Sequence, residues 1–232
     1  MSDKKGNLIV KIIIIILICA VDLLWSAHFI YDWKQAGTVI SVRNASQDVP
    51  GILKQNVIVA AIPIVLLIIF AVILKGRFAD EMYMRLSRNG KVRIVQIRII
   101  ILLAVVLMGI AAYAFATKRD KITALYCLLY YVVFIAFTEE FVVRDVCVYL
   151  LKNENGYVRY IVPNVVFAVM HIFAYAGWND ITVNYVISFV TSQMLGLVLV
   201  GCFFQFLREK SQIIWIPVLV HGIMDYFSVL NY

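Results

Sequence analysis

The sequence predicts an all-α polytopic membrane protein, a bundle of about seven transmembrane helices. The first observation is composition: 63% of the 232 residues are hydrophobic and 15% are charged, whereas a soluble domain is about 45–50% apolar and about 25% charged. The second is length, because runs such as VIVAAIPIVLLIIFAVIL approach the roughly 20 apolar residues that a membrane span needs. The third is the physical requirement that backbone N–H and C=O groups in hydrocarbon form hydrogen bonds within the protein. Apolar runs of this length meet this requirement by forming helices.

The predicted helices follow one another closely along the chain. The apolar runs place them at residues 8–29, 53–74, 95–116, 122–151, 160–176, 181–206 and 213–230. The first has the basic start of a signal peptide, but Asp22 and Trp25 stand where small residues would mark a cleavage site, so an uncleaved helix is expected. Residues 1–121 are expected to form three N-terminal helices with a basic loop at 75–93, and residues 122–232 a four-helix core.

The net charge of +7 is explained by a membrane. With seven helices, one side of the membrane carries twelve Lys and Arg near helix ends, and the other side carries five. Basic loops stay in the cytosol, so the sequence predicts a multi-pass protein of the cell membrane with a cytosolic N-terminus and Tyr232 on the far side. The charges flank helices instead of forming one patch. The expected partner is therefore the lipid bilayer, and no nucleic acid is expected.

Ionisable side chains inside the spans mark functional positions, because each costs about 2.5–3.5 kcal/mol on insertion scales. They gather on three helices: Glu139, Glu140, Arg144 and Asp145 on the fourth, His171 on the fifth, and His221 with Asp225 on the seventh. At the rise of an α-helix, Glu139, His171 and His221 lie roughly 20, 17 and 12 Å from the cytosolic ends of their helices. The sequence therefore predicts a site between helices four, five and seven. Asp22 and His28 of the first helix are expected in the outer half of the membrane or at its outer surface.

Spacing within these helices separates the two glutamates. Residues four apart share a helix face, so Glu140 and Arg144 are expected to form an ion pair. His221 and Asp225 are also four apart, so the aspartate can orient the imidazole. Glu139 is rotated from the ion-paired face by about 100°. It is the carboxylate predicted to be free.

Three short stretches together resemble a known family. EEFVVR (Glu139 to Arg144) fits EExxxR, FAVMH (Phe167 to His171) fits FxxxH, and HGIMD (His221 to Asp225) fits HxxxN/D. In this order they resemble the motifs of the CPBP family of intramembrane proteases, also called the CAAX protease, bacteriocin-processing or Abi family. The resemblance covers residues 139–225. Aspartate closes the third motif where many members have asparagine.

The resemblance implies an intramembrane endopeptidase that hydrolyses a peptide bond in a membrane-associated or lipidated peptide or protein. Glu139 and His171 would activate water, while His221 and the residue at Asp225 would stabilise the oxyanion. We favour Asp225 as the residue that orients His221, because a carboxylate donates a hydrogen bond only when it is protonated. Glu140 and Arg144 would complete the site as an ion pair.

Metal catalysis is the alternative mechanism. Glu139, His171 and His221 could provide a His₂Glu zinc set with one position left for water. The sequence contains no HExxH, and a glutamate mechanism without any cofactor is the favoured expectation. Two other functions stay open: a polytopic transporter, which would show inverted repeats that are not apparent here, and a catalytically silent membrane scaffold or immunity protein.

Overall fold

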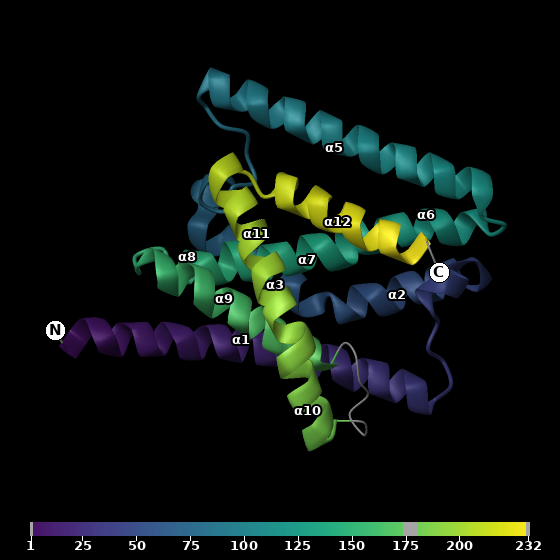
Figure 1. Cartoon of the computed structure of the whole chain (residues 1–232), viewed down its shortest axis with the longest axis horizontal. Coiled ribbons are helices and arrows are strands. Elements are labelled where there is room, and N and C mark those ends of the chain that lie inside the picture. Colours follow the sequence, from purple (N-terminus) through teal and green to yellow (C-terminus); the bar gives the residue numbers. More distant parts are fainter. Residues whose placement is uncertain (1, 174–180, 231–232) are drawn as a thin grey trace.

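The computed structural model describes residues 2–173 and 181–230, and the regular elements in that part of the chain are helical (Figure 1). The first elements are α1 (Ser2–Gln35), η1 (Val42–Gln47), α2 (Val49–Val59), α3 (Ala61–Leu74), η2 (Lys75–Arg77), α4 (Phe78–Glu81) and α5 (Gly90–Thr117). The fourth predicted helix comprises α6 (Lys121–Leu129), η3 (Tyr130–Phe137), α7 (Thr138–Glu140), η4 (Phe141–Cys147) and α8 (Val148–Leu150). The last elements are α9 (Gly156–Met170), η5 (His171–Phe173), α10 (Val183–Phe189), η7 (Val190–Met194), α11 (Leu195–Ser211) and α12 (Trp215–Leu230). Tyr232 and residues 174–176 of the predicted fifth helix lie outside the described residues.

The predicted helical membrane bundle is confirmed. In the described part of the chain, five helices are long and apolar enough to cross a membrane: Asn7–Gln35, Ala61–Glu81, Gly90–Thr117, Lys121–Leu150 and Val183–Ser211. The other two predicted spans correspond to the shorter apolar helices α9 and α12. The rod formed by α10 and α11 crosses the remaining helices steeply (Figure 1).

The second predicted helix, 53–74, is wrong as a single element, because the chain breaks at Ala60 between α2 and α3. Pro63 has no N–H and leaves the carbonyl of Val59, four residues earlier, without its helical donor. Two side chains of α1 donate hydrogen bonds to carbonyls at the end of α2. Ser26 Oγ donates to the Val59 carbonyl at 3.4 Å, and Trp25 Nε1 donates to the Ile58 carbonyl at 2.7 Å. The break in the second helix therefore provides acceptors that attach the C-terminal half of α1.

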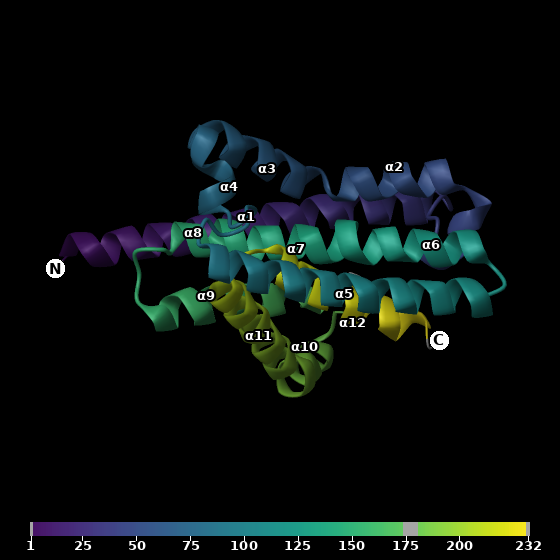
Figure 2. The same ribbon diagram turned by 90° about the horizontal axis from the view of Figure 1, so that it is seen from above.

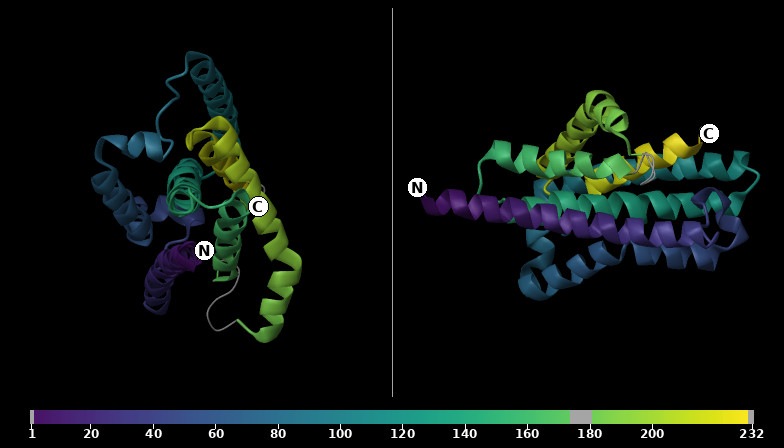
Figure 3. Two further views of the ribbon diagram at one scale, coloured as in Figure 1. Left: turned by 90° about the vertical axis from the view of Figure 1, so that its left-hand side faces the viewer. Right: turned by 90° about the horizontal axis from the view of Figure 1, so that it is seen from below.

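The fourth helix forms the centre of the bundle. Viewed along its axis, it is surrounded by the other helices (Figure 3, left). Its middle part buries Phe141 and Val146 in an apolar cluster that includes Ile15 of α1 and Ile214, just before α12. Its first turns pack on α5 and α12 in a second cluster. Residues 140–148 of this helix are buried, so the polar side chains of this part face protein instead of lipid.

The N-terminal end of the fourth helix is fixed by Asp120, its N-cap. The Asp120 carboxylate accepts hydrogen bonds from Ser46 Oγ, from Thr123 Oγ1 at 2.6 Å and from the Thr123 backbone N–H at 2.9 Å. A capping carboxylate satisfies amide groups that have no partner in the first turn. The hydroxyl of Ser46, followed by the Thr123 donors, lowers the pKa of Asp120 below its usual range. The cap also joins η1 to the start of α6.

The basic segments counted on the predicted cytosolic side lie at one end of the bundle (Figures 1 and 2). The N-terminus, the segment after α4, the α8–α9 connection and the α11–α12 connection meet there. Ion pairs join them: Lys11 of α1 pairs with Glu154 at 2.5 Å, and Lys152 pairs with Glu81 at 3.4 Å. Two residues that were counted in the loop after the sixth helix, Arg208 and Lys210, belong to the last turn of α11, and Arg208 is buried.

Candidate active site

The two glutamates of the first motif lie between two π-helical segments. The first segment, η3, ends at Phe137; α7 carries Glu139 and Glu140; and η4 begins at Phe141. A π-turn is wider than an α-turn, so it changes which side chains share a face, and such turns occur frequently at functional sites. The fourth helix is therefore continuous through the motif but locally irregular on both sides of it.

Glu140 makes the predicted ion pair and a second contact that the spacing does not show. Both Glu140 and Arg144 are fully buried, and Glu140 Oε2 lies 3.4 Å from Arg144 Nε. The other carboxylate oxygen, Oε1, lies 3.0 Å from Nδ1 of His221. Glu140 thus joins the first motif to the third, across 81 residues of sequence.

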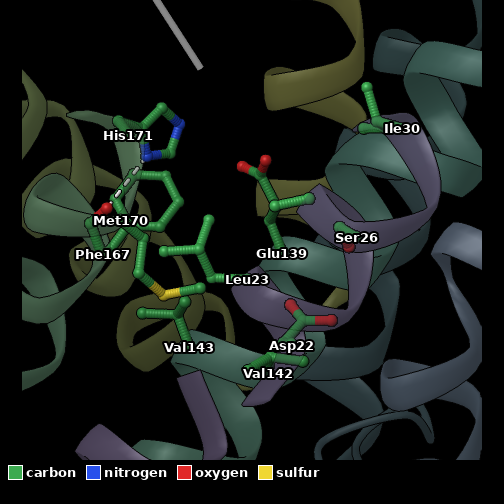
Figure 4. A pocket seen from close by; sticks show the side chains of 11 residues that line it. Asp22, Leu23, Ser26, Ile30, Glu139, Val142, Val143, Phe167, Met170 and His171 are labelled. Carbon is green, nitrogen blue, oxygen red and sulfur yellow. Dashed lines mark hydrogen bonds between the residues drawn. The ribbon is translucent and has the colours of Figure 1, made fainter. Parts of the chain in front are cut away.

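Glu139 faces a different environment. Its side chain is 29% exposed, and its Oε2 lies 3.8 Å from Nε2 of His221. The carboxylate points into a cavity towards His171 of the second motif (Figure 4). Glu139 therefore shares the cavity with His171 and lies near His221, so it is close to a residue of each of the other two motifs.

In the second motif, the first residue, Phe167, holds the imidazole of the last residue, His171. His171 Nδ1 lies 2.9 Å from the carbonyl oxygen of Phe167, and the two rings meet edge to face at 4.3 Å between centroids (Figure 4). A carbonyl only accepts hydrogen bonds, so Nδ1 must carry the proton. In neutral His171 the lone pair is therefore on Nε2, the nitrogen free to bind a water molecule.

The third motif places His221 among acceptors and against an aromatic ring. Asp225 Oδ2 lies 3.3 Å from His221 Nε2, so the predicted contact between these residues is present. The ring of Phe204 stacks on the imidazole at 4.7 Å. Phe204 and Phe167 also cover the guanidinium of Arg144, at 5.8 and 4.6 Å from their ring centroids. Sequence reasoning missed Phe204, because an aromatic residue in an apolar helix carries no signal of its own.

The cavity beside Glu139 has a volume of about 250 Å³. Its walls come from α1, the fourth helix and α9, and they include Leu23, Val142 and Met170 (Figure 4). Asp22 also lines it, although the sequence analysis did not include this residue among the site residues. His28 is exposed, as expected for a residue away from the site.

Comparison with known proteins agrees with this arrangement. Residues 121–227 match the family model described as Type II CAAX prenyl endopeptidase Rce1-like. This core belongs to the CAAX protease family. No curated protein and no solved structure matches the chain. The match includes all three motifs of the CAAX protease core, whereas α1 and its Asp22 lie before it. The division of the chain after residue 121 remains a prediction.

A second polar cluster supports the CAAX protease core from the end of the bundle that carries the N-terminus. The carboxylate of Asp145 receives the guanidinium of Arg208, with Oδ1 at 2.9 Å from Nε and 2.8 Å from Nη2. Gln205, one turn earlier in α11, donates to the carbonyl of Arg159 at 2.9 Å. That carbonyl has no helical donor because Pro163 stands four residues later. These partners were not predicted, since they depend on how α11 packs against α9.

Close packing around Arg144 requires a glycine in α11. A Cβ at Gly201 would lie 3.0 Å from Arg144 Nη2 and closer still to Asn164 Oδ1, whereas a Cβ at Gly196 meets nothing within 4 Å. We expect Gly201→Ala to lower the stability of the CAAX protease core by about 1–3 kcal/mol, as overpacking does. Gly196→Ala, in the same helix, is the matched control and should be neutral or stabilising by about 0.5–1 kcal/mol. Thermal unfolding of both variants in detergent tests this, and equal melting temperatures would contradict it.

The predicted zinc set can be compared with the geometry of the CAAX protease site. Among the described residues, no three His, Cys, Asp or Glu side chains converge closely enough to hold a metal ion. Nδ1 of His221 lies 3.0 Å from Glu140, and its Nε2 lies 3.3 Å from Asp225. As placed, Glu139, His171 and His221 therefore do not fit the His₂Glu set, and no step of the proposed mechanism involves a metal.

Proposed function

We propose that this protein is an intramembrane endopeptidase that hydrolyses a peptide bond in a membrane-associated or lipidated peptide or protein. One observation carries the proposal: Glu139 lines the cavity with His171 and lies 3.8 Å from His221, so each of the three motifs contributes a residue to one place. The family match, whose members are described as prenyl endopeptidases, supports the same reaction class.

Glu139 is the proposed general base. Its carboxylate borders the cavity, where a water molecule and the scissile carbonyl would meet. Glu139 would take a proton from the water as the oxygen attacks the carbonyl carbon, and it would later pass this proton to the leaving amine. His171 would orient the same water through the lone pair of Nε2, because its Nδ1 is committed to the Phe167 carbonyl. This assignment keeps the attacking water between two acceptors.

His221 is the proposed oxyanion donor. When protonated, an imidazole donates from both nitrogens. Glu140 would accept the Nδ1 proton, which fixes the ring, while Asp225 sits beside Nε2 and favours the charged form. During the reaction, Nε2–H would donate to the negative oxygen of the tetrahedral intermediate. A fixed donor aimed at developing charge is worth about 3–4 kcal/mol of transition-state stabilisation.

Turnover without metal tests the reaction class. We expect detergent-purified protein to cleave at least one member of a library of membrane-associated and lipidated peptides, with products identified by mass. Cleavage should survive dialysis against a chelator, because Glu139 supplies the base. Activity that is lost on dialysis and restored by zinc alone would establish metal catalysis instead. A silent scaffold would cleave no peptide before or after dialysis.

We also propose that the end of the bundle carrying the N-terminus faces the cytosol. The excess of Lys and Arg at that end supports this orientation. A reporter that is active only in the cytosol should work when it is inserted into the segment between α4 and α5. The same reporter fused after Tyr232 should be silent. The reverse pattern would invert the topology.

A further inference from the structure

A carboxylate from outside the family core lies in the wall of the active-site cavity. Asp22 belongs to α1, inside the span Asn7–Gln35, whereas the family match begins at residue 121. Asp22 and Glu139 both line the cavity and lie within electrostatic range of each other (Figure 4). An ionisable group inside a span is costly and therefore marks a candidate functional position.

Asp22 differs from the other acids at this depth because it has no counter-charge. Glu140, Asp145 and Asp225 each face an arginine or histidine nitrogen within 3.4 Å. Among the described residues, no hydrogen bond or ion pair reaches the Asp22 carboxylate. A carboxylate held away from water is stabilised by a cation, so a molecule that binds in this cavity is expected to supply one.

The residues that line the cavity indicate which kind of cationic group would fit. Leu23, Val142 and Met170 give the wall an apolar surface next to the Asp22 carboxylate. A group with an aliphatic stem and a charged end matches such a surface, and the side chains of lysine and arginine have this form. The site and its wall carry four carboxylates against one guanidinium and two imidazoles. When all four are ionised, these carboxylates exceed the positive charge by one, even with both imidazoles protonated.

We propose that Asp22 is a specificity-determining residue that binds a lysine or arginine side chain of the peptide substrate, close to the scissile bond. The inference rests on the proposed function, because the same cavity receives the scissile bond beside Glu139. The orientation of α1 supports it: Trp25 and Ser26 hydrogen-bond to the carbonyls of Ile58 and Val59 at the end of α2. These bonds hold the helix in the rotation that turns Asp22 towards the cavity.

Pairs of peptides that differ at one position, where one peptide has lysine and the other has methionine, test the proposal. The exchange is made in turn at each position near the bond that the wild-type protein cleaves. At one position, wild-type kcat/KM should favour lysine at least tenfold, which corresponds to the lower part of the range for a desolvated charge pair. Asp22→Asn should remove this preference, because its kcat/KM for the lysine peptide should fall to the value for the methionine peptide. Asp22→Lys should instead favour a glutamate peptide, an inversion that a purely structural role does not produce.

A carboxylate elsewhere on the same helix provides the control. Asp32 lies on the exposed surface of α1, 3.5 Å from His28, so Asp32→Asn should keep the lysine preference. Melting temperatures of all variants show whether they fold. Equal cleavage of both peptides by the wild type, or an equal loss on both in Asp22→Asn, would overturn the inference and leave the proposed function intact. If the wild type cleaves no peptide, the proposed function fails and this inference fails with it.

Discussion

Glu139→Gln is expected to fold normally and to lose nearly all peptidase activity. The substitution keeps the volume of the side chain but removes the proposed base, a loss that typically costs 10²–10⁴-fold in rate. Stability should change little, because the Glu139 side chain is 29% exposed to the cavity and its nearest cationic partner is 3.8 Å away. Turnover of a cleaved peptide and the melting temperature in the same detergent measure both effects.

Turnover and melting temperature together distinguish the possible outcomes of this experiment. If Glu139 is the base, its neutral variant is stable and inactive. A Glu139→Gln protein that turns over the peptide at the wild-type rate would transfer the role of base to another residue. A variant that is inactive because it has unfolded would show a lower melting temperature, which distinguishes loss of structure from loss of chemistry.

Glu140→Gln is expected to destabilise the protein. Glu140 and Arg144 are both fully buried, and the same carboxylate also contacts His221 at 3.0 Å. Neutralising it leaves the arginine without its counter-charge, and breaking a buried pair in this way costs about 3–5 kcal/mol. For a chain of this length that corresponds to a fall in melting temperature of about 10 °C. Activity should fall with it, because His221 loses the acceptor that fixes its ring.

A surface ion pair gives the matched control. Glu81 pairs with Lys152 at 3.4 Å, and both side chains are partly exposed. Glu81→Gln therefore removes the same charge from a solvated pair and should cost less than about 1 kcal/mol. Equal melting temperatures for Glu140→Gln and Glu81→Gln would show that the buried pair does not stabilise the core.

The helices were largely predictable, and the break within the second one was not. Apolar runs reveal spans because lipid admits few other segments. Pro63 is visible in the sequence, but a proline can bend or break a helix, depending on what satisfies the freed carbonyls. Here Trp25 and Ser26 of α1 do so. Their side chains meet α2 only because the two helices pack together.

Contacts within one helix were predictable, and contacts between helices were missed. Glu140 and Arg144 are four residues apart, so their pairing follows from helical geometry. The contact between Glu140 and His221 spans 81 residues, and the one between Asp145 and Arg208 spans 63. No local pattern encodes these distances. The catalytic roles assigned to the motif residues remain predictions for the variants above to test.

The membrane environment, the helical class and the three motifs follow from the sequence alone, and the common depth of the motifs is a prediction from it. The tertiary structure decided that Glu139 borders the cavity, that Glu140 serves both Arg144 and His221, and that Asp22 of α1 forms part of the cavity wall. The physical reason is the solvent. In a soluble protein the apolar face of a helix identifies its buried side, but lipid is as apolar as the protein interior. The rotation of each helix about its axis is therefore set by packing and by polar contacts between helices, which appear only when the helices are assembled.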